Sequence, residues 1–529
     1  MEQLKKRLAV LRLLLVLLYC TAAVHLARLA EAPELVQAAA EQGTDTCEAG
    51  SARGTIYDRR GVPLVNARTV CTAVVSPTPE AAEALLPHVT DAEAFLEHMA
   101  QGKPFACTVD TAAIDCPDVT LLELPQRYAA VQTAQHIIGY TREGSGVAGL
   151  ESAYDAVLRS ADARWSVTFS VDGTGRPLAG APKQIRYGAN PVQGVMTTLD
   201  SRIQRICEAA GASLEKGCIV VMEVSSGDIL GLASFPGYRA DALDEALSDP
   251  DSPLIQRAAY AYPVGSIFKL VTAACAFGEG RGYDFTWDCD GAVSVGTQRF
   301  RCHALQGHGV QQMADAMRSS CNPYFIALGQ TLSGQKLLET AKALGFGREI
   351  MLTANLTASG GTLPTEQQLK LPAELANFSF GQGVLTASPL QITRMTCAIA
   401  GDGTLPAVRL VRGLTENGRT VLREETGMKE PGISPETAAF LRQLMCYTAA
   451  DRDFQGRPAH VSMGAKTSTA QTGRYDADGN EYCHGWVTAF FPADAPKYAV
   501  TVLAEDGGYG NQTAAPVLRQ IAAAILREP

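Results

Sequence analysis

The sequence predicts an α+β fold in which the C-terminal part of the chain forms an antiparallel sheet flanked by helices. Two apolar runs, 218–224 and 229–235, are separated by the turn sequence SSGD and are typical of the two buried strands of a hairpin. A strongly apolar helix is expected at 266–277 and a further strand at 497–505. Strands that stand before and after a helical middle indicate one sheet covered by helices.

The elements around this core follow from the same patterns. Residues 201–214 are expected to be helical, and 515–527 to form a closing helix with Pro516 in its first turn. Residues 31–195 are mixed and loop-rich, with strand-like stretches such as 70–75. Because domains usually have roughly 100–200 residues, a chain of 529 residues, 46% of them hydrophobic, is expected to hold two or more domains with real cores.

The first thirty residues predict a membrane anchor. An unbroken apolar or small run covers 13–24, and the stretch 8–27 is roughly long enough to span a bilayer. Three basic residues at 5–7 precede it, so the positive-inside rule keeps the N-terminus cytoplasmic and exports everything after about residue 30. A cleaved signal peptide is the alternative. The anchor is favoured because the apolar character continues to residue 29 without a clear small-x-small cleavage site.

Composition narrows the choice of partners and of compartment. The net charge of −10 argues against nucleic acid as a partner, because phosphate binding needs a basic footprint. Fourteen cysteines are many for an exported protein, and an oxidising exterior would favour their pairing. Two candidate pairs of cysteines close together in the sequence are Cys107–Cys116 and Cys289–Cys302.

Two of these cysteines also raise the question of a metal site, because His303 and His308 follow Cys289 and Cys302. The paired C-x(2–4)-C half of a zinc signature is missing from this stretch. The sequence therefore predicts no metal and no cofactor. A disulfide or free buried thiols are the simpler explanations of these cysteines.

The segment YPVGSIFKLVTA at 262–273 carries a candidate reactive pair. Ser266 and Lys269 lie one turn apart on one face of the expected helix, which places a nucleophile beside a base. A serine hydroxyl needs a neighbour to take its proton, and a lysine can do so when burial or nearby positive charge lowers its pKa. Alone, the pair is better explained as an amphipathic helix with a surface lysine, because such short patterns occur by chance.

Two further motifs in the right order reverse that preference. They are Ser320-Cys321-Asn322 and Lys466-Thr467-Ser468. The ordered set S-x-x-K, S-D-N and K-T-G is the signature of penicillin-binding proteins and class A β-lactamases. This chain matches the set nearly completely, with a Ser-x-Asn second motif and a third motif that ends in serine. Each motif is common by itself, whereas the ordered triple is not.

The rest of the chain resembles one branch of that superfamily, the class B penicillin-binding proteins, which are monofunctional peptidoglycan D,D-transpeptidases. The similar segments are RGTIYDRRGVPL at 53–64, GVAGLESAYDAVL at 146–158, MTTLDSRIQ at 196–204, SFGQGVLTASPLQ at 379–391 and TAAPVL at 513–518. The resemblance therefore covers nearly the whole chain, from about residue 53 to 518.

This resemblance implies a serine transpeptidase fold for 196–529, a pedestal or dimerisation domain at 31–195, and a cytoplasmic tip with a single-pass anchor at 1–30. It implies an enzyme that cross-links peptidoglycan by D,D-transpeptidation through a serine acyl-enzyme, on the outer side of a bacterial cell membrane. The expected partners are stem peptides that end in D-Ala-D-Ala, β-lactam antibiotics and a membrane glycosyltransferase.

The resemblance also implies a role for each motif residue. Ser266, at a helix N-terminus whose dipole favours a developing alkoxide, would attack the carbonyl between the last two D-alanines. Lys269 would be the general base, and Ser320 would relay a proton to the leaving amine. Asn322 would bind the backbone amide of the substrate or Lys269. Lys466 would supply positive charge for the terminal carboxylate of the substrate.

Three residues of the third motif region are expected to bind the substrate. The hydroxyl of Thr467 would contact the same carboxylate, and the N–H groups of Ser266 and Thr469 would form an oxyanion hole, often worth several kcal/mol. Ser468 stands where the family usually has glycine, which lets strand and substrate approach closely. We expect its side chain to narrow the cleft without closing it, because serine is the next smallest polar residue.

Two other functions remain open at this point. A β-lactam sensor or β-lactamase of the same fold would share the three motifs, but the long segment before residue 196 and the SFGQGVLTASPLQ element argue against it. A catalytically weak scaffold of a cell-wall synthesis complex would fit a third motif weakened at Ser468, whereas the retained serines, lysines and Asn322 of the three motifs favour catalysis. Roles in elongation, division and sporulation stay equally open.

Overall fold

The computed structural model describes residues 1–30, 32, 43–159, 163–188, 193–240, 242–424 and 427–527. They form two compact units. The first comprises Met1–Arg53, Arg68–Arg127 and Ser160–Pro191, and the second comprises Gly54–Ala67, Tyr128–Arg159 and Val192–Pro529. Two segments of the stretch expected to be the pedestal therefore pack in the second unit, so the division at residue 195 stays a prediction. The expected boundary at residue 31 lies outside the described residues.

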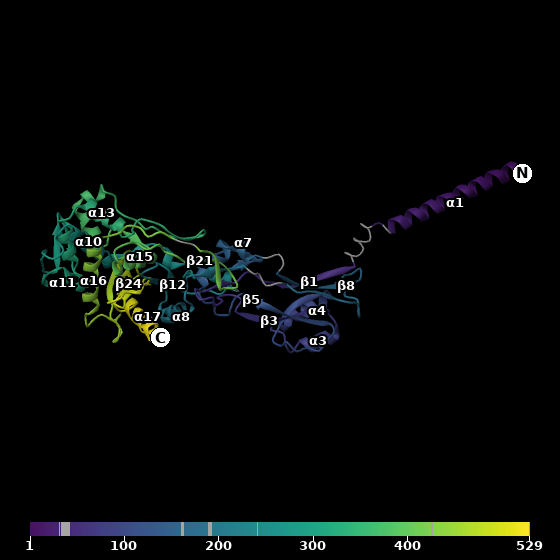
Figure 1. Ribbon diagram of the computed structural model, residues 1–529, viewed down its shortest axis with the longest axis horizontal. Helices are drawn as coiled ribbons and strands as arrows, with labels where there is room; N and C mark the ends of the chain where they lie inside the picture. Colours follow the sequence, from purple (N-terminus) through teal and green to yellow (C-terminus); the bar gives the residue numbers. More distant parts are fainter. Residues whose placement is uncertain are drawn as a thin grey trace. The chain divides into compact units, whose positions relative to one another are not determined.

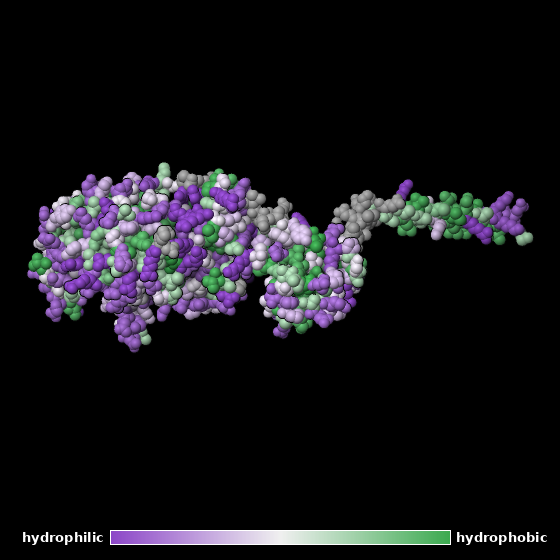
Figure 2. Space-filling view, turned by 60° about the horizontal axis from the view of Figure 1, so that its bottom comes forward, coloured by the Kyte–Doolittle hydropathy of each residue, from purple (hydrophilic) through white to green (hydrophobic). Residues whose placement is uncertain are grey.

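The first unit begins with the long helix α1 (Glu2–Ala30). None of its residues is buried, and its most apolar window has a mean hydropathy of 2.1, so it is long and apolar enough to cross a membrane. Figure 2 shows a band of hydrophobic residues along this helix and hydrophilic residues at its N-terminal end. This distribution agrees with the predicted anchor.

The rest of the first unit contains two small antiparallel sheets. One has the order β1–β8–β9 and the other β4–β3–β5. The strand expected at 70–75 lies within β3. The bounds are β1 (Thr44–Ser51), β3 (Arg68–Val75), β4 (Phe105–Val109), β5 (Val119–Gln126), β8 (Arg164–Ser170) and β9 (Gln184–Arg186), with helices α3 (Pro79–Leu85) and α4 (Ala92–Gln101).

The second unit is built on a five-stranded antiparallel sheet with the order β12–β11–β25–β24–β23. Its strands are β11 (Gly217–Glu223), β12 (Ile229–Phe235), β23 (Gly464–Tyr475), β24 (Glu481–Phe491) and β25 (Tyr498–Ala504). The expected hairpin is present, with Ile219 opposite Ala233. The predicted α+β fold, an antiparallel sheet with helices on it, is confirmed.

Both faces of this sheet are covered, which explains why the two hairpin strands β11 and β12 are almost entirely apolar. Side chains alternate along a strand, so Ile219 and Val221 pack into one cluster and Val220 and Met222 into another. Helices α8 (Ser201–Ala210) and α17 (Ala514–Leu526) contact one side, and α15 (Pro389–Ala400) contacts the other. All twelve residues of α15 are buried, so it is the central helix of the core.

Further helices of the second unit pack around this core, and Figure 1 shows α10, α11, α13 and α16 grouped beside the sheet that contains β24. Their bounds are α10 (Lys269–Gly278), α11 (Met313–Arg318), α12 (Asn322–Gly329), α13 (Gly334–Ala343), α14 (Pro372–Ser379) and α16 (Pro435–Ala449). The helix expected at 266–277 begins later than predicted. Residues 265–268 form a 3₁₀ turn before α10, and Gly265 at the start of this turn has a φ of +59°.

The second unit also contains short antiparallel strand pairs, three of which position residues of the site. They are β13 (Tyr262–Pro263) with β20 (Thr386–Ala387), β14 (Trp287–Cys289) with β17 (Gly309–Gln311), and β15 (Ala292–Val295) with β16 (Gln298–Arg301). The second unit also contains a sheet ordered β2 (Ile56–Tyr57), β10 (Gln193–Thr197), β21 (Val411–Glu416), β22 (Thr420–Glu424), and the hairpin β18 (Ile350–Thr353) with β19 (Leu356–Ala358).

Candidate active site

Ser266 lies in the 3₁₀ turn 265–268, which we call the serine turn. The strand β13 leads into it and is held by its ladder with β20. Ile267 and Phe268 are fully buried, whereas Ser266 is partly exposed. The buried neighbours anchor the turn in the core, and the serine hydroxyl remains accessible to a substrate.

A second segment fastens the serine turn from the other side. The N–H of Gly265 donates a hydrogen bond of 3.0 Å to the carbonyl of Gly381. Gly381 has a φ of +90°, and a Cβ at this position would overlap the carbonyl oxygen of Gly265. Only glycine therefore allows the two backbones to approach so closely. The segment SFGQGVLTASPLQ, which contains this glycine, was the available signal in the sequence.

Lys269 is completely buried one turn after Ser266. Its Nζ donates to the Ser320 carbonyl at 2.7 Å and to Asn322 Oδ1 at 2.7 Å, and it lies within hydrogen-bond distance of the Ser320 hydroxyl at 3.2 Å. Burial, followed by the charge of Lys466, holds the pKa of Lys269 well below its ordinary value. The amine is thus disposed to be neutral, as a general base must be.

Ser320 stands between two lysines. It lies in the turn between α11 and α12, with a φ of +52°, a strained conformation for a residue other than glycine. Lys466 Nζ donates to the Ser320 hydroxyl at 3.1 Å and to the carbonyl of Thr467 at 2.9 Å. The Ser320 hydroxyl is therefore within hydrogen-bond distance of both Lys269 and Lys466.

The third motif lies on β23, the last strand in the order of the five-stranded sheet. Lys466 is 1% exposed, and this burial lowers its pKa to about 7. Thr467 and Thr469 are partly exposed and alternate with buried neighbours along the strand. Among the described strands β23 pairs only with β24, so its other edge can receive an extended peptide as an added strand.

The structure corrects the expectation for Ser468. Its side chain is 3% exposed, and its hydroxyl donates a hydrogen bond of 2.8 Å to the carbonyl of Val264. It shares the buried face of β23 with Lys466 and Ala470, because alternate residues of a strand point the same way. The side chain thus contacts the backbone just before the serine turn and does not narrow the cleft.

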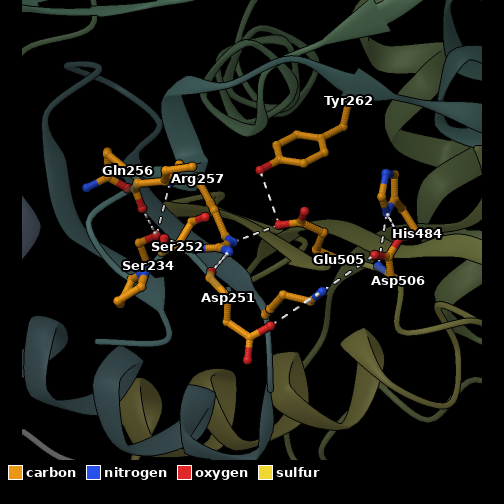
Figure 3. A network of polar contacts seen from close by, with 12 residues as sticks. Ser234, Asp251, Ser252, Gln256, Arg257, Tyr262, His484, Glu505 and Asp506 are labelled. Carbon is orange, nitrogen blue, oxygen red and sulfur yellow. Dashed lines mark hydrogen bonds and ion pairs between the residues drawn. The ribbon is translucent and has the colours of Figure 1, made fainter. Parts of the chain in front are cut away.

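A network of charged and polar groups supports the segment that leads to the serine turn. Arg257 is 3% exposed, and its Nε donates to Glu505 at 2.7 Å. Figure 3 shows Arg257 and Tyr262 both pointing toward Glu505, and the Tyr262 hydroxyl donates to it at 3.5 Å. The N–H of Asp506 donates to His484 Nδ1 at 3.0 Å. These contacts join the strand before Ser266 to the end of β25, and motif reasoning did not identify them.

The fold thus gathers motif residues from distant parts of the chain. Hydrogen-bond distances of 2.7 to 3.2 Å join Lys269, Ser320, Asn322 and Lys466, and Ser266 lies one helical turn before the first of these. Thr467 and Thr469 follow on the same strand as Lys466. The catalytic role of each residue stays a prediction. All fourteen cysteines lie in the described residues and are free thiols, so neither candidate disulfide is formed there.

Comparison with known proteins identifies the family. A family model described as the penicillin binding protein transpeptidase domain matches residues 217–523. A peptidoglycan D,D-transpeptidase PbpA of Mycolicibacterium smegmatis is 32% identical over 436 residues, which cover 76% of this chain and 83% of the relative. Stage V sporulation protein D of Bacillus subtilis is 28% identical over 519 residues, covering 89% and 77% respectively.

Solved structures agree with these relatives. A structure of a peptidoglycan synthase complex that coordinates polymerization and crosslinking contains a chain that is 26% identical, with a TM-score of 0.68 and 98% of both chains covered. PBPA from Mycobacterium tuberculosis has the same fold, with 24% identity, a TM-score of 0.66, and 90% of this chain and 100% of that chain covered. The predicted resemblance is confirmed, and the chain belongs to the class B penicillin-binding proteins.

Proposed function

We propose that this chain is a membrane-anchored peptidoglycan D,D-transpeptidase in which Ser266 is the acylated nucleophile. The observation that carries the proposal is the hydrogen-bonded group of Lys269, Ser320, Asn322 and Lys466 beside the partly exposed serine turn. Because the chain belongs to the transpeptidase family, we assign transpeptidation to this arrangement. The PbpA relative is itself named a peptidoglycan D,D-transpeptidase.

The contacts of Lys269 favour its role as the base. The two carbonyl oxygens that it contacts most closely, on Ser320 and Asn322, can only accept hydrogen bonds. They use both N–H bonds of a neutral amine, which leaves the nitrogen lone pair for a serine hydroxyl. A neutral Lys269 can therefore take a proton from Ser266 without breaking either contact.

The reaction follows as two acyl transfers. Ser266 Oγ attacks the carbonyl carbon of the penultimate D-Ala, and its proton passes to Lys269. The C–N bond to the terminal D-Ala then breaks, and the leaving nitrogen receives a proton through the Ser320 hydroxyl. The amine of a neighbouring stem peptide attacks the resulting ester, and the same groups move its proton in the reverse direction. Ser266 is released, and one cross-link has formed.

The end of the substrate that binds near the third motif is expected to be anionic. The free carboxylate of D-Ala-D-Ala would lie near Lys466 and the partly exposed Thr467, at the unpaired edge of β23. A bound carboxylate would raise the pKa of Lys466 and keep its amine charged, because an opposite charge favours the ionised form. Backbone N–H groups of Ser266 and Thr469 would form the oxyanion hole.

The location of the enzyme follows from α1. Its basic start supports a cytoplasmic N-terminus and an extracytoplasmic second unit. A membrane glycosyltransferase that makes the glycan strands is the proposed partner, as one solved relative belongs to a complex of polymerization and crosslinking. Protease added to cells without walls should digest the chain after α1 and spare a tag at the N-terminus.

Intact mass spectrometry of the full-length protein after incubation with benzylpenicillin tests the nucleophile. We expect one covalent adduct on the wild type and none on Ser266→Ala. Ser248→Ala, which removes an exposed hydroxyl elsewhere in the second unit, should be acylated like the wild type. The wild type should also exchange the terminal D-Ala of a synthetic stem peptide for a labelled D-amino acid.

Three outcomes would contradict the proposal. Persistence of the adduct in Ser266→Ala would place the nucleophile elsewhere. Rapid hydrolysis of the adduct, with turnover of nitrocefin, would indicate a β-lactamase. Failure of the folded wild type to bind penicillin and to exchange D-Ala would indicate a scaffold.

A further inference from the structure

Three cysteines and one histidine meet in the second unit, beside the second motif. They are Cys289, Cys302, His308 and Cys321. One ligand atom from each lies within 4.8 Å of all the others, and the three cysteines are buried. The motif roles described above use none of these four side chains. Such a concentration of soft ligands needs its own explanation.

The spacing of these atoms fits a small tetrahedral ion. Zinc binds thiolate at about 2.3 Å and imidazole at about 2.0 Å, so its ligand atoms lie roughly 3.5–3.8 Å apart. Cys302 Sγ lies 3.5 Å from His308 Nδ1, which is within that range. Modest side-chain rotations would bring the remaining atoms of the group from at most 4.8 Å to the same separation.

The backbone holds three of these residues in place. Cys289 ends β14, and its carbonyl accepts a hydrogen bond of 2.9 Å from the N–H of His308, just before the paired strand β17. The N–H of Cys302, which follows β16, donates to the carbonyl of Gly291 at 2.8 Å. Two short ladders therefore fix the positions from which Cys289, Cys302 and His308 converge.

The fourth residue comes from a different part of the chain. Cys321 is the residue before α12, and its N–H donates to the carbonyl of Ala316 at 2.9 Å. Sequence reasoning compared only Cys289, Cys302 and two nearby histidines with a zinc signature, and it found no C-x(2–4)-C pair. The fold supplies Cys321 in place of the missing half, so the prediction of no metal does not account for this cluster.

We propose that Cys289, Cys302, His308 and Cys321 bind one Zn²⁺ ion as a structural Cys₃His site. Four nitrogen and sulfur ligands, three of them buried, are the set that closed tetrahedral zinc sites use. His303 is excluded from the set because its side chain is exposed and its Nδ1 lies 3.9 Å from Cys302 Sγ, farther than that of His308.

The site would fasten the second motif, because Cys321 stands between Ser320 and Asn322. Ser320 has a φ of +52°, and such a conformation persists only where its surroundings hold it. An ion on Cys321 would tie this turn to the β14–β17 ladder and so fix the two groups that contact Lys269. This link to catalysis rests on the proposed function, whereas metal binding itself does not.

Metal analysis of the full-length protein, purified in detergent without chelator, gives the first test. We expect about one zinc per chain, the stoichiometry of a single closed site. Cys302→Ser and His308→Ala should lose it. His303→Ala, which changes the exposed neighbour, and Cys397→Ser, which changes a buried thiol in α15, should retain it. Unchanged zinc content in both ligand variants would overturn the site.

Cobalt gives a second test that does not depend on the folding of a variant. Co²⁺ added to the metal-depleted wild type should produce the intense visible bands of tetrahedral cobalt and a thiolate-to-cobalt charge-transfer band. Zn²⁺ should abolish both. A chain without zinc that gives neither band, or one whose mass shows a Cys289–Cys302 disulfide as purified, would overturn the proposal.

The link to the second motif is tested by acylation of the same samples. Metal depletion should slow the reaction with benzylpenicillin by roughly 10- to 100-fold, the scale on which supporting contacts of metal sites act, and Zn²⁺ should restore it. An unchanged acylation rate in protein shown to have lost its zinc would overturn this link. If the wild type with zinc bound is not acylated at all, the proposed function fails while the metal site stands.

Discussion

The hydroxyl of Ser468 donates a hydrogen bond of 2.8 Å to the backbone carbonyl of Val264, and this contact joins the third motif to the segment that leads to Ser266, the proposed nucleophile. A Cβ at Gly265 would collide with the same hydroxyl, so the two chain segments are closely fitted. The serine therefore fills space between β23 and the serine turn. Its effect on catalysis should come through the position of Ser266.

Replacement of Ser468 should slow acylation. Ser468→Ala removes the hydroxyl and leaves the buried carbonyl of Val264 without this donor, which should lower the free energy of unfolding by about 1 kcal/mol. Ser468→Gly also removes the Cβ and should cost roughly 0.5–1 kcal/mol more. Thermal melts and second-order acylation rates with one penicillin and one cephalosporin measure both effects. Faster acylation of Ser468→Gly than of wild type would restore the idea that this side chain narrows the cleft.

The acylation rate should show a bell-shaped dependence on pH. On the acid side the rate should rise with pH as Lys269 loses its proton, because burial and the charge of Lys466 hold the pKa of Lys269 well below its ordinary value. On the alkaline side it should fall as Lys466, with a pKa of about 7, loses the charge that attracts the substrate carboxylate. Stopped-flow acylation at constant ionic strength measures the profile.

Lys466→Arg is the matched variant for the alkaline side, because a guanidinium stays charged throughout. In that variant the decline should move to higher pH while the acid limb stays. A decline at the same pH in Lys466→Arg would assign the alkaline limb to another group.

Lys466 should also make stability depend on pH. Burial lowers its pKa from 10.5 to about 7, so between these values the unfolded chain binds a proton that the folded chain does not. The free energy of unfolding should therefore rise with pH across this window, by at most about 1.4 kcal/mol per pH unit from this group. Below about pH 7 both states are protonated, and the contribution should be flat.

Denaturant titrations from pH 7 to 10 measure this slope. Lys466→Met should reduce it, whereas Lys370→Met, which removes an exposed lysine, should leave it unchanged. Equal slopes in wild type and Lys466→Met would refute the lowered pKa.

Gly381 should tolerate no side chain. Gly381→Ala forces a Cβ against the carbonyl of Gly265 and should displace the serine turn, with acylation lost or reduced by at least about 100-fold, as misplaced reacting groups usually cause. Gly383→Ala is the matched control, because Gly383 has a similar φ of +81° but a Cβ there would meet only side-chain atoms at ordinary contact distance, from Asn377 at 3.4 Å and Glu374 at 3.9 Å. Both variants share the cost of a left-handed alanine, about 1–2 kcal/mol. Similar acylation rates in the two variants would show that the contact with Gly265 is dispensable.

Local patterns in the sequence were sufficient for the type of fold and for most of the site. The apolar runs of the hairpin predicted β11 and β12, because a strand covered on both faces has no polar alternation. The order of three short motifs predicted a site made of Ser266, Lys269, Ser320, Asn322 and Lys466, and the fold brings the last four of these within hydrogen-bond distance of one another. The length of the apolar run at 8–27 and the three basic residues before it likewise predicted that this segment is a membrane anchor.

Only the tertiary structure decided which side chains face one another. The direction of Ser468 depends on which face of β23 the serine turn covers, and a sequence pattern of period two does not say which face is inward. Gly381 and Gly265 meet although they are far apart in the chain. Cys321 joins Cys289, Cys302 and His308 for the same reason. Such contacts arise when separate segments pack together, so no local spacing along the sequence encodes them.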